Sequence, residues 1–460
     1  SSHAIIFVCS SHHVMISFVS VLVASFYAPL VTGYELVAAG AYHTIVVENG
    51  QAFAVGSNDF GQLGDGSTIQ RRSWVSVMQG VKNVAAGKRH SVFVKQDGTA
   101  WITGSSSGGQ LGDARNGGKQ THPIQVMRNV RAAAVGDHHS VFLTLDGAAY
   151  TMGDNRHGQL GDGTLHSRSS VVQVVANGVR HVSAGSAHSL FVLDDGIVMG
   201  SGANFNGQLG NNTKFYCGRD CTFPESHFQV VRPVKLKDRI QHAVAGGNST
   251  MMIDTSGIVW VSGQNDLGQL CREEWGSINT FMAISRQQKD AVLGMHHSAS
   301  VAKDGTALVC GLNSHGQLGY MQQLRNSVAW QGTPIAILAG IQSAAVGNEH
   351  TVFLDIRGRV WGAGSNSYGQ IGNLTMPRSL VDMAGTTIRA VQVTTVAPRI
   401  VELNSSTAFG VVLLFVSIAV VSMIFGHKAA HYFAARIDTA GMDDFDGNAL
   451  DVWNQISGTE

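Results

Sequence analysis

The sequence has no excess charge of either sign and little charge of any kind. Lys plus Arg and Asp plus Glu both number 31, and charged residues make up only 13% of the chain. Without a net positive charge the chain has no overall field that would attract nucleic acid, so we expect no nucleic-acid partner. With 44% hydrophobic residues among 460, the chain can nevertheless bury a large core, which excludes a disordered protein.

Motifs for catalysis and metal binding are also missing. The sequence contains no Walker loop, no His-Glu-x-x-His and no Cys-x-x-Cys. Residues 154–163 (DNRHGQLGDG) look like a calcium loop, but they lack the terminal Glu that would bind calcium through both oxygens. We therefore expect no enzyme activity, no metal and no cofactor.

Glycine, in contrast, is abundant, with 55 residues against 7 prolines, and it recurs in two phrases. Gly-Gln-Leu-Gly, with small variations, begins at Gly61, Gly109, Gly158, Gly207, Gly268, Gly316 and Gly369. Gly-x-x-His-Ser/Thr keeps the same spacing, but its fifth copy, residues 246–250, has Ser249 where the others have His. Self-similarity at a period of about 50 residues is typical of propellers, solenoids and other repeat arrays.

One repeat shows what each period contains. β-rich runs at residues 91–95 and 99–103 flank Asp97-Gly98, a dipeptide that favours the positive φ angles of a two-residue hairpin turn. An apolar strand precedes Gly87, and another lies around residues 75–78, so each period supplies four short strands, the size of a propeller blade. No long helical period interrupts the array. The pattern therefore predicts an all-β, seven-bladed β-propeller over residues 34–393.

The two ends of the array differ from its middle. Residues 34–40 resemble the run before each Gly-x-x-His but lack an upstream strand, and residues 379–393 repeat the upstream strand pattern without a following hairpin. Because a propeller must hide the edges of its first and last blades, we expect both chain ends to combine in one terminal blade.

Together, Gly-x-x-His-Ser, Asp-Gly and Gly-x-Asn-x-x-Gly-Gln-Leu-Gly resemble the repeats of the regulator of chromosome condensation family over roughly residues 34–393. The resemblance implies a seven-bladed propeller that recognises proteins, but it implies no single function, because members include a nuclear exchange factor for a small GTPase, a plant photoreceptor, a β-lactamase inhibitor and receptor ectodomains. The variable pairs of the Gly-x-x-His phrases lack the photoreceptor's tryptophans, and the N-terminus lacks the basic tail of the exchange factor.

The histidines of the repeat occupy the same position in separate blades. For this reason we interpret them as buried, hydrogen-bonding residues that fix a turn, not as metal ligands or proton-transfer groups. They are His43, His90, His139, His188, His297 and His350.

The fourth repeat is longer than the others, with 61 residues between Gly207 and Gly268, because it carries an insertion at residues 214–228. Cys217 and Cys221 are four residues apart and are predicted to form a disulfide, as in an oxidising compartment. The same loop is a candidate partner-binding knob, although its aromatic side chains fit equally well packed onto their own blade. Its candidate contacts are Phe215, Tyr216, Arg219 and Phe223. Cys271 and Cys310, elsewhere in the array, are interpreted as isolated substitutions.

Two uncharged apolar segments flank the array. Residues 1–33 are predicted to be a cleaved signal peptide or an N-terminal anchor, and residues 408–425 a transmembrane helix that follows a linker at 394–407. Lys428 and Arg436 come directly after that helix, which favours a cytosolic, acidic tail at 426–460 and a propeller on the other side of the membrane. Four candidate glycosylation sites agree with that orientation: Asn211, Asn248, Asn373 and Asn404.

These features support one functional prediction and two alternatives. The first is a membrane-anchored binding module that recognises a protein outside the cytosol, in an extracellular or lumenal space. The second is an exchange or regulatory factor for a small GTPase, and the third is a structural accessory subunit of a membrane complex, including one in an organelle membrane.

Overall fold

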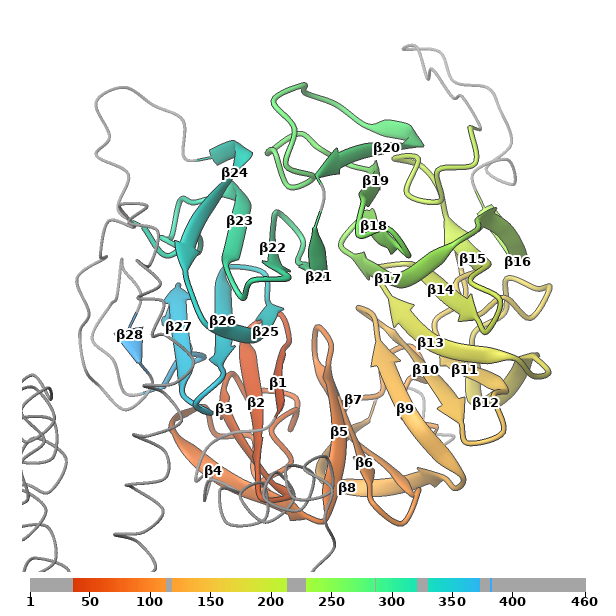
Figure 1. Cartoon of the computed structure of the whole chain (residues 1–460). Helices are drawn as coiled ribbons and strands as arrows, with labels where there is room; N and C mark the ends of the chain where they lie inside the picture. Colours follow the sequence, from red (N-terminus) through yellow and green to blue (C-terminus); the bar gives the residue numbers. More distant parts are fainter. Residues whose placement is uncertain are drawn as a thin grey trace, which may run out of the picture. The chain divides into compact units, whose positions relative to one another are not determined.

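A computed structural model describes residues 36–112, 118–212, 229–285, 287–320, 330–372 and 381–382. These residues form seven four-stranded antiparallel sheets arranged as a ring (Figure 1). They fall in the first of two compact units, residues 1–392. The predicted all-β, seven-bladed propeller is therefore confirmed, and no helix occurs within the described ranges.

Each blade is built from four strands that are consecutive in the chain. Blade 1 contains β1 (Leu36–Ala39), β2 (His43–Glu48), β3 (Gln51–Gly56) and β4 (Arg71–Gln79). Blade 2 contains β5 (Val81–Ala86), β6 (His90–Lys95), β7 (Ala100–Ser105) and β8 (Lys119–Met127). Blade 3 contains β9 (Val130–Val135), β10 (His139–Thr144), β11 (Ala149–Gly153) and β12 (Arg168–Val175).

The remaining four blades have the same plan. Blade 4 contains β13 (Val179–Ala184), β14 (His188–Leu193), β15 (Val198–Ala203) and β16 (Gln229–Lys237). Blade 5 contains β17 (Ile240–Gly246), β18 (Ser249–Asp254), β19 (Val259–Gly263) and β20 (Ile278–Ser285). Blade 6 contains β21 (Gln288–Leu293), β22 (His297–Ala302), β23 (Ala307–Leu312) and β24 (Trp330–Leu338). Blade 7 contains β25 (Ile341–Val346), β26 (His350–Asp355), β27 (Val360–Gly364) and β28 (Val381–Asp382).

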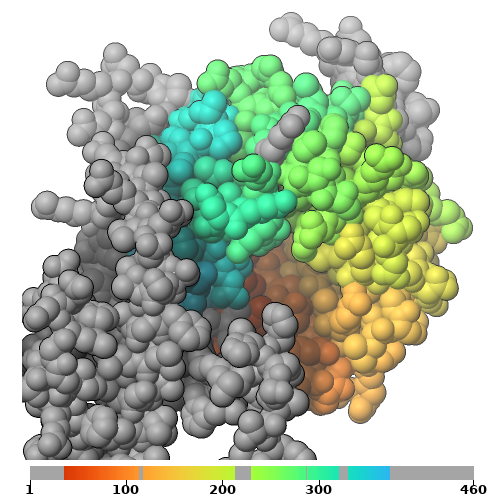
Figure 2. Space-filling view, viewed as in Figure 1, coloured from red at the N-terminus to blue at the C-terminus, as the bar shows by residue number. Residues whose placement is uncertain are grey.

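The core of the ring lies between neighbouring blades. First strands surround the centre and fourth strands lie at the outside (Figure 1), while second strands such as β6 are buried along nearly their whole length. One apolar cluster joins Val92 and Ile102 of blade 2 to Phe142 and Met152 of blade 3. Removing such side chains from water is the main force that holds one blade against the next. Figure 2 shows the blades following one another around the ring in sequence order.

The predicted grouping of strands into blades is wrong in one respect. Strand β4, which contains residues 75–78, pairs with β3 of the preceding hairpin, and not with β5. Only Gly80 separates β4 from β5, and its positive φ of 79° turns the chain from one sheet into the next. The predicted mixed terminal blade is also wrong, because blade 1 is complete with β1–β4 and β28, within residues 379–393, completes blade 7.

The seven hairpins are confirmed, but six of their turns differ from the prediction. In blade 2, Gly98 N–H donates to Lys95 and Lys95 N–H donates to Thr99, so the loop has three residues and only Gly98 has positive φ. This is a type I turn followed by a glycine bulge. In blade 1, Asn49 and Gly50 both have positive φ and form the predicted two-residue turn.

Several predictions concern residues outside the described ranges. These are the segment at 1–33, the Cys217–Cys221 disulfide with its loop at 214–228, Asn373, Asn404, the linker at 394–407, the helix at 408–425 and the tail at 426–460. Among the described residues, no helix is both long enough and apolar enough to span a membrane.

Candidate protein-binding face

Two loops of every blade lie at the same end of the sheet. In blade 1 the N–H of Ser57, just after β3, donates to the carbonyl of Tyr42 in the β1–β2 loop at 2.8 Å, and Ser105 and Arg89 repeat this contact in blade 2. The loops between first and second strands and between third and fourth strands therefore share one face of the ring, which we call the variable face. The hairpin turns between second and third strands lie on the opposite face.

Repeated amide side chains shape the longer loops of this face. The Oδ1 of Asn58 accepts the Leu63 N–H at 3.0 Å, while the Oε1 of Gln62 accepts the Phe60 N–H at 3.0 Å. Both amides are buried. Asn155 and Gln159 make the same two bonds in blade 3. The repeated Asn and Gln thus have structural roles, and the two residues between Asn and Gly-Gln-Leu-Gly are left to vary.

The repeated histidines connect one blade to the next. Each imidazole Nε2 lies 2.8–3.1 Å from a hydroxyl of the next blade. That hydroxyl belongs to the Ser or Thr that ends the next blade's copy of Gly-x-x-His-Ser/Thr. The pairs are His43–Ser91, His90–Ser140, His139–Ser189, His188–Thr250, His297–Thr351 and His350–Thr44. The sequence interpretation included a hydrogen-bonding role in a turn but missed that the partner belongs to the neighbouring blade.

The hydroxyls define the protonation of these imidazoles. Ser91 Oγ donates its hydrogen to the Gln62 carbonyl at 2.7 Å, so it must accept the hydrogen on His43 Nε2. Nδ1 is then unprotonated, and it has no hydrogen-bond partner among the described residues. Complete burial lowers the pKa of His43 to about 4 and that of His350 to about 3. Such neutral, enclosed imidazoles are structural groups and are unsuited to proton transfer with a ligand.

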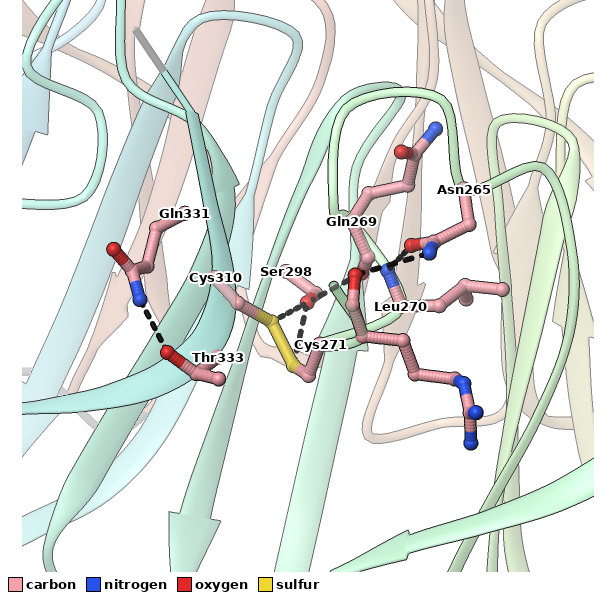
Figure 3. Close-up of a disulfide and its surroundings, with 9 residues drawn as sticks. Asn265, Gln269, Leu270, Cys271, Ser298, Cys310, Gln331 and Thr333 are labelled. Atoms are coloured by element: carbon pink, nitrogen blue, oxygen red, sulfur yellow. Dashed lines mark hydrogen bonds between the residues drawn. A yellow bond between two sulfur atoms is a disulfide. The ribbon is translucent and has the colours of Figure 1, made fainter. Parts of the chain in front are cut away.

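The boundary between blades 5 and 6 is different. Ser249 replaces the histidine, and its hydroxyl donates to Gln264 within its own blade. Cys271 and Cys310 form a disulfide across this boundary, with Ser298 beside both sulfurs (Figure 3). The interpretation of these two cysteines as isolated substitutions is therefore wrong. Their separation of 39 residues carried no pairing signal, because only the folded ring brings the two positions together.

Aromatic and cationic side chains gather on the variable face at blades 1 and 2. The guanidinium carbon of Arg89 lies 4.4 Å from the centre of the Phe60 ring, and Lys119 Nζ lies 5.1 Å from it. Arg89 and Lys119 are exposed, and Lys88 beside them is half-buried. We call Phe60, Lys88, Arg89 and Lys119 the basic patch. The sequence signal for Phe60, Lys88 and Arg89 was the variable pair that precedes Gly-Gln-Leu-Gly together with the pair inside Gly-x-x-His, whereas Lys119, at the start of β8, belongs to neither pair.

Other aromatic contacts occur at further blade boundaries near the variable face. Tyr42 of blade 1 lies 5.0 Å from Tyr368 of blade 7, and His157 of blade 3 lies 5.5 Å from Phe205 of blade 4, between ring centres. Phe205 is 46% exposed and Tyr368 is 37% exposed, which leaves apolar surface open to solvent. Isolated apolar residues are normal on surfaces, but aromatics repeated on one face indicate a contact surface.

A hollow lies at the inner ends of these loops, on the ring axis. Its volume is about 160 Å³, and all seven blades contribute to its wall, largely through the glycines of Gly-x-x-His. Lys88 and Asp137 form an ion pair of 3.3 Å in this wall. Ligand pockets usually measure about 300–1,000 Å³, so this hollow is small for a metabolite or cofactor.

The two described glycosylation candidates have different surroundings. Asn248 lies on the variable face, half-buried, and its amide nitrogen donates to Gln264 at 3.2 Å. Attachment of a glycan to that nitrogen would displace this contact. Asn211 is half-buried after the Gly-Gln-Leu-Gly of blade 4, where its Oδ1 accepts from Asn204 at 2.9 Å.

Comparison with known families identifies the repeat. Residues 49–94, 146–192 and 304–354 match the Regulator of chromosome condensation (RCC1) repeat. A second description of this repeat matches residues 35–62, 81–110, 130–159, 179–208 and 341–370. These matches do not include residues 209–303, where blade 5 has lost the histidine and the final glycine of its phrases. The chain carries RCC1 repeats folded as a seven-bladed propeller.

Curated relatives align with part of the chain. The secretion-regulating guanine nucleotide exchange factor of Bos taurus is 30% identical over 172 residues, which are 36% of each protein. The regulator of chromosome condensation of Xenopus laevis is 29% identical over 147 residues, 31% of this chain and 34% of the relative. The alignments thus span about a third of the length of these relatives.

Solved structures share the fold at low sequence identity. Human WBSCR16 is 20% identical, with a TM-score of 0.61 over 72% of this chain and 93% of that protein. Yeast RCC1 (Prp20), solved bound to Kap60, is 16% identical, with a TM-score of 0.62 over 78% of this chain and 86% of that protein. At these identities the similarity establishes the propeller fold and nothing further.

Proposed function

We propose that this chain is a non-enzymatic propeller that binds a protein partner through its variable face, centred on the basic patch. The observation that supports this proposal best is the separation of roles within each repeat. The repeated His, Asn and Gln are buried and hydrogen-bonded to Ser or Thr hydroxyls or to the backbone, whereas the variable pairs supply aromatic and cationic groups that reach the surface. Selection for binding can change the latter without disturbing the ring.

The chemistry of the basic patch defines the kind of partner. Aromatic residues and arginine contribute a large share of the energy at protein interfaces, and Phe60 and Arg89 are already held together by a cation–π contact. Two cationic side chains, Arg89 and Lys119, lie over the Phe60 ring, whereas Lys88 beside them is paired with Asp137. We therefore infer a partner segment that presents carboxylates to blade 2.

A second candidate function is regulation of a small GTPase. It is favoured by the relatives, since one is named a guanine nucleotide exchange factor and another the regulator of chromosome condensation. A GTPase is itself a protein partner, so both candidate functions use the same binding surface. They differ in whether binding accelerates the release of nucleotide. The same patch would then contact the GTPase, and nucleotide release would be the readout.

The location proposed for the propeller is the outer side of a membrane, in the extracellular space or an organelle lumen. The Cys271–Cys310 disulfide supports this location, because structural disulfides persist mainly in oxidising compartments. The uncharged run at 408–425 would be the membrane anchor, and the segment at 1–33 would direct the chain there. Gel electrophoresis before and after treatment with a glycosidase tests this location. We expect the treated protein to migrate faster, and unchanged migration would count against the location.

Partner labelling with two matched variants tests the proposed binding face. A promiscuous labelling enzyme is fused to the full chain, and labelled proteins are compared between the natural sequence, Phe60→Ala/Arg89→Ala and Leu145→Ala/Ile356→Ala. Leu145 and Ile356 are 56% and 68% exposed, and they lie in hairpin turns on the opposite face. We expect a specific partner to be lost only with the first variant. Loss only with the second variant would place binding on the opposite face.

Nucleotide release separates the two candidate functions. The full chain is added to small GTPases loaded with a fluorescent guanine nucleotide. Binding without faster release supports a recognition module, whereas acceleration that is abolished by Arg89→Ala supports the exchange function. Labelled partners that are all extracellular or lumenal would exclude a cytosolic GTPase as the natural target.

A further inference from the structure

The boundary between blades 5 and 6 has lost one connection and gained another. At the six other boundaries an imidazole bonds the next blade's hydroxyl, but here Ser249 occupies the histidine position. Ser298, the hydroxyl that such a histidine would reach, still donates to Gln269 at 2.8 Å. The Cys271–Cys310 disulfide lies directly beside Ser298 (Figure 3). The loss and the gain thus occur at the same boundary.

The cysteines occupy two repeat positions that face each other across the boundaries that follow blades 1, 2 and 3. Cys271 replaces the last glycine of Gly-Gln-Leu-Gly. Cys310 lies in β23, directly before Gly311, which is the last buried residue of that strand. A Cβ built on Gly64, Gly112 or Gly161 would lie 3.2, 2.9 or 2.9 Å from the equivalent residue of the next blade. Those residues are Thr103, Met152 and Ser201. The repeat geometry therefore directs the side chain of Cys271 toward Cys310.

The backbone at Cys271 strengthens this assignment. Its φ is +57°, and the glycines at the same position in the other blades have φ between +57° and +84°. A side chain in this left-handed region is unfavourable, so glycine is the expected residue. A cysteine retained there indicates that its sulfur has a role that offsets the backbone cost.

We propose that the Cys271–Cys310 disulfide replaces the missing histidine connection, which makes one boundary of the ring dependent on redox state. Oxidation of the two thiols forms the S–S bond and releases two protons and two electrons, which an exchanging disulfide accepts as it becomes a dithiol. Reduction reverses this reaction and leaves blades 5 and 6 with neither the covalent nor the imidazole connection. The ring would then open most readily at this boundary.

Two parts of the histidine site are still present at this boundary, although Leu293 now lies against Gly246, with its Cβ 2.4 Å from where a Cβ on Gly246 would be. In blade 1, a Cβ on Gly40 would lie 2.3 Å from Cε1 of His43, so the glycine makes room for the ring. Blade 5 keeps the equivalent glycine, Gly246, and blade 6 keeps Ser298. A Ser249→His substitution should therefore restore the original connection, which provides a direct test of whether the two kinds of link are equivalent.

Peptide mapping tests the bond itself. The full chain is purified without reductant, alkylated, digested and analysed by mass spectrometry. We expect one linked pair of peptides containing Cys271 and Cys310. Recovery of both residues as alkylated thiols from the oxidised, folded chain would overturn the proposal.

Thermal unfolding of a small set of variants tests the replacement. Cys271→Gly/Cys310→Ala should lower Tm by about 5 °C, and adding Ser249→His should recover most of that loss. In the chain with the disulfide, Ser249→His should raise Tm by much less. Equal increases in both backgrounds, or no effect of removing the cysteines, would show that the disulfide does not substitute for the histidine.

Two controls make the comparison specific. Adding Ser298→Ala to the rescued variant should abolish the recovery, because the introduced imidazole then has no hydroxyl partner. Reductant should lower the Tm of the natural chain toward that of the double cysteine variant. The effect of reductant on the variant, which lacks Cys271 and Cys310, measures any contribution of Cys217 and Cys221. A fall in Tm that is as large in the variant as in the natural chain would assign redox sensitivity to those other cysteines.

Discussion

At the scale of single residues, a hydroxyl and an imidazole form the unit that joins the blades. Ser91 bridges His43 Nε2 and the Gln62 carbonyl, so one small side chain satisfies two buried groups of the preceding blade. All three residues are essentially inaccessible to solvent. Buried polar groups are costly when they lose a partner, which makes this unit sensitive to very small changes.

Removal of one hydroxyl should therefore have different costs at different boundaries. Ser91→Ala should lower the free energy of unfolding by about 1–3 kcal/mol, because it leaves His43 and the Gln62 carbonyl without their partner. Ser298→Ala, the matched change at the boundary without a histidine, loses the bond to Gln269 and the contacts with the two disulfide sulfurs but leaves no imidazole unpaired, so it should cost less. Urea unfolding of both variants measures the difference. A larger loss for Ser298→Ala would contradict the bridging role.

Stability should also fall in mild acid. Burial lowers the pKa of the repeated histidines to about 3 or 4, below the value of 6.5 that applies when the chain unfolds. The unfolded chain therefore binds more protons, and stability is retained above pH 6.5 and lost as the pH falls toward 4. Each histidine contributes a slope of about 1.4 kcal/mol per pH unit at most.

Urea unfolding between pH 7 and pH 5 checks this expectation. His90→Gln should reduce by about one the number of protons taken up on unfolding near pH 5, and so flatten the dependence of stability on pH. Stability that is constant or rises toward pH 5 would contradict the neutral, buried state of the imidazoles.

At the scale of loops and strands, one asparagine holds the long loop of the variable face in six blades, while blade 2 has Ser106 at that position. The Asn58 amide nitrogen donates to Asp65 and to the Ser67 and Ile69 carbonyls, while its oxygen accepts from Leu63. Exposed binding residues are thereby presented on a loop that is internally rigid. Such preorganisation lowers the entropy lost when a partner binds.

Replacement of that asparagine should damage both stability and presentation. Asn58→Ala should cost about 2–3 kcal/mol, because the buried Leu63 N–H and several carbonyls lose a partner. Asp59→Ala changes the exposed neighbouring residue and should cost less than about 0.5 kcal/mol. Thermal unfolding compares the two variants, and equal effects would show that the loop is not held by Asn58.

The sequence predicted the strands and hairpins because their signals are local. It did not predict which sheet receives β4, since β4 follows one hairpin through a long loop and precedes the next through Gly80 alone. It also missed the histidine partners and the Cys271–Cys310 pair, which lie in different blades. The basic patch likewise draws Phe60 from one blade and Arg89 from another, so only the closed ring reveals it.

At the scale of the whole ring, closure depends on side chains and not on a shared sheet. His350 Nε2 reaches Thr44 at 3.0 Å, and Arg72 donates to the Ser367 carbonyl at 2.9 Å, both from one end of the array to the other. An apolar cluster containing Val46 and Val352 fills the same boundary. The first and seventh blades thus meet as the other histidine-linked blades do.

The most direct test of the account is the affinity of the full chain for the partner found by labelling. Kd is measured for the natural chain, Arg89→Glu in the basic patch, and Ile356→Glu on the opposite face. We predict that Arg89→Glu weakens binding at least about tenfold, because it places a negative charge against the partner's carboxylates, and that Ile356→Glu leaves Kd unchanged. Full affinity with Arg89→Glu, together with loss of binding for Ile356→Glu, would contradict recognition through the variable face.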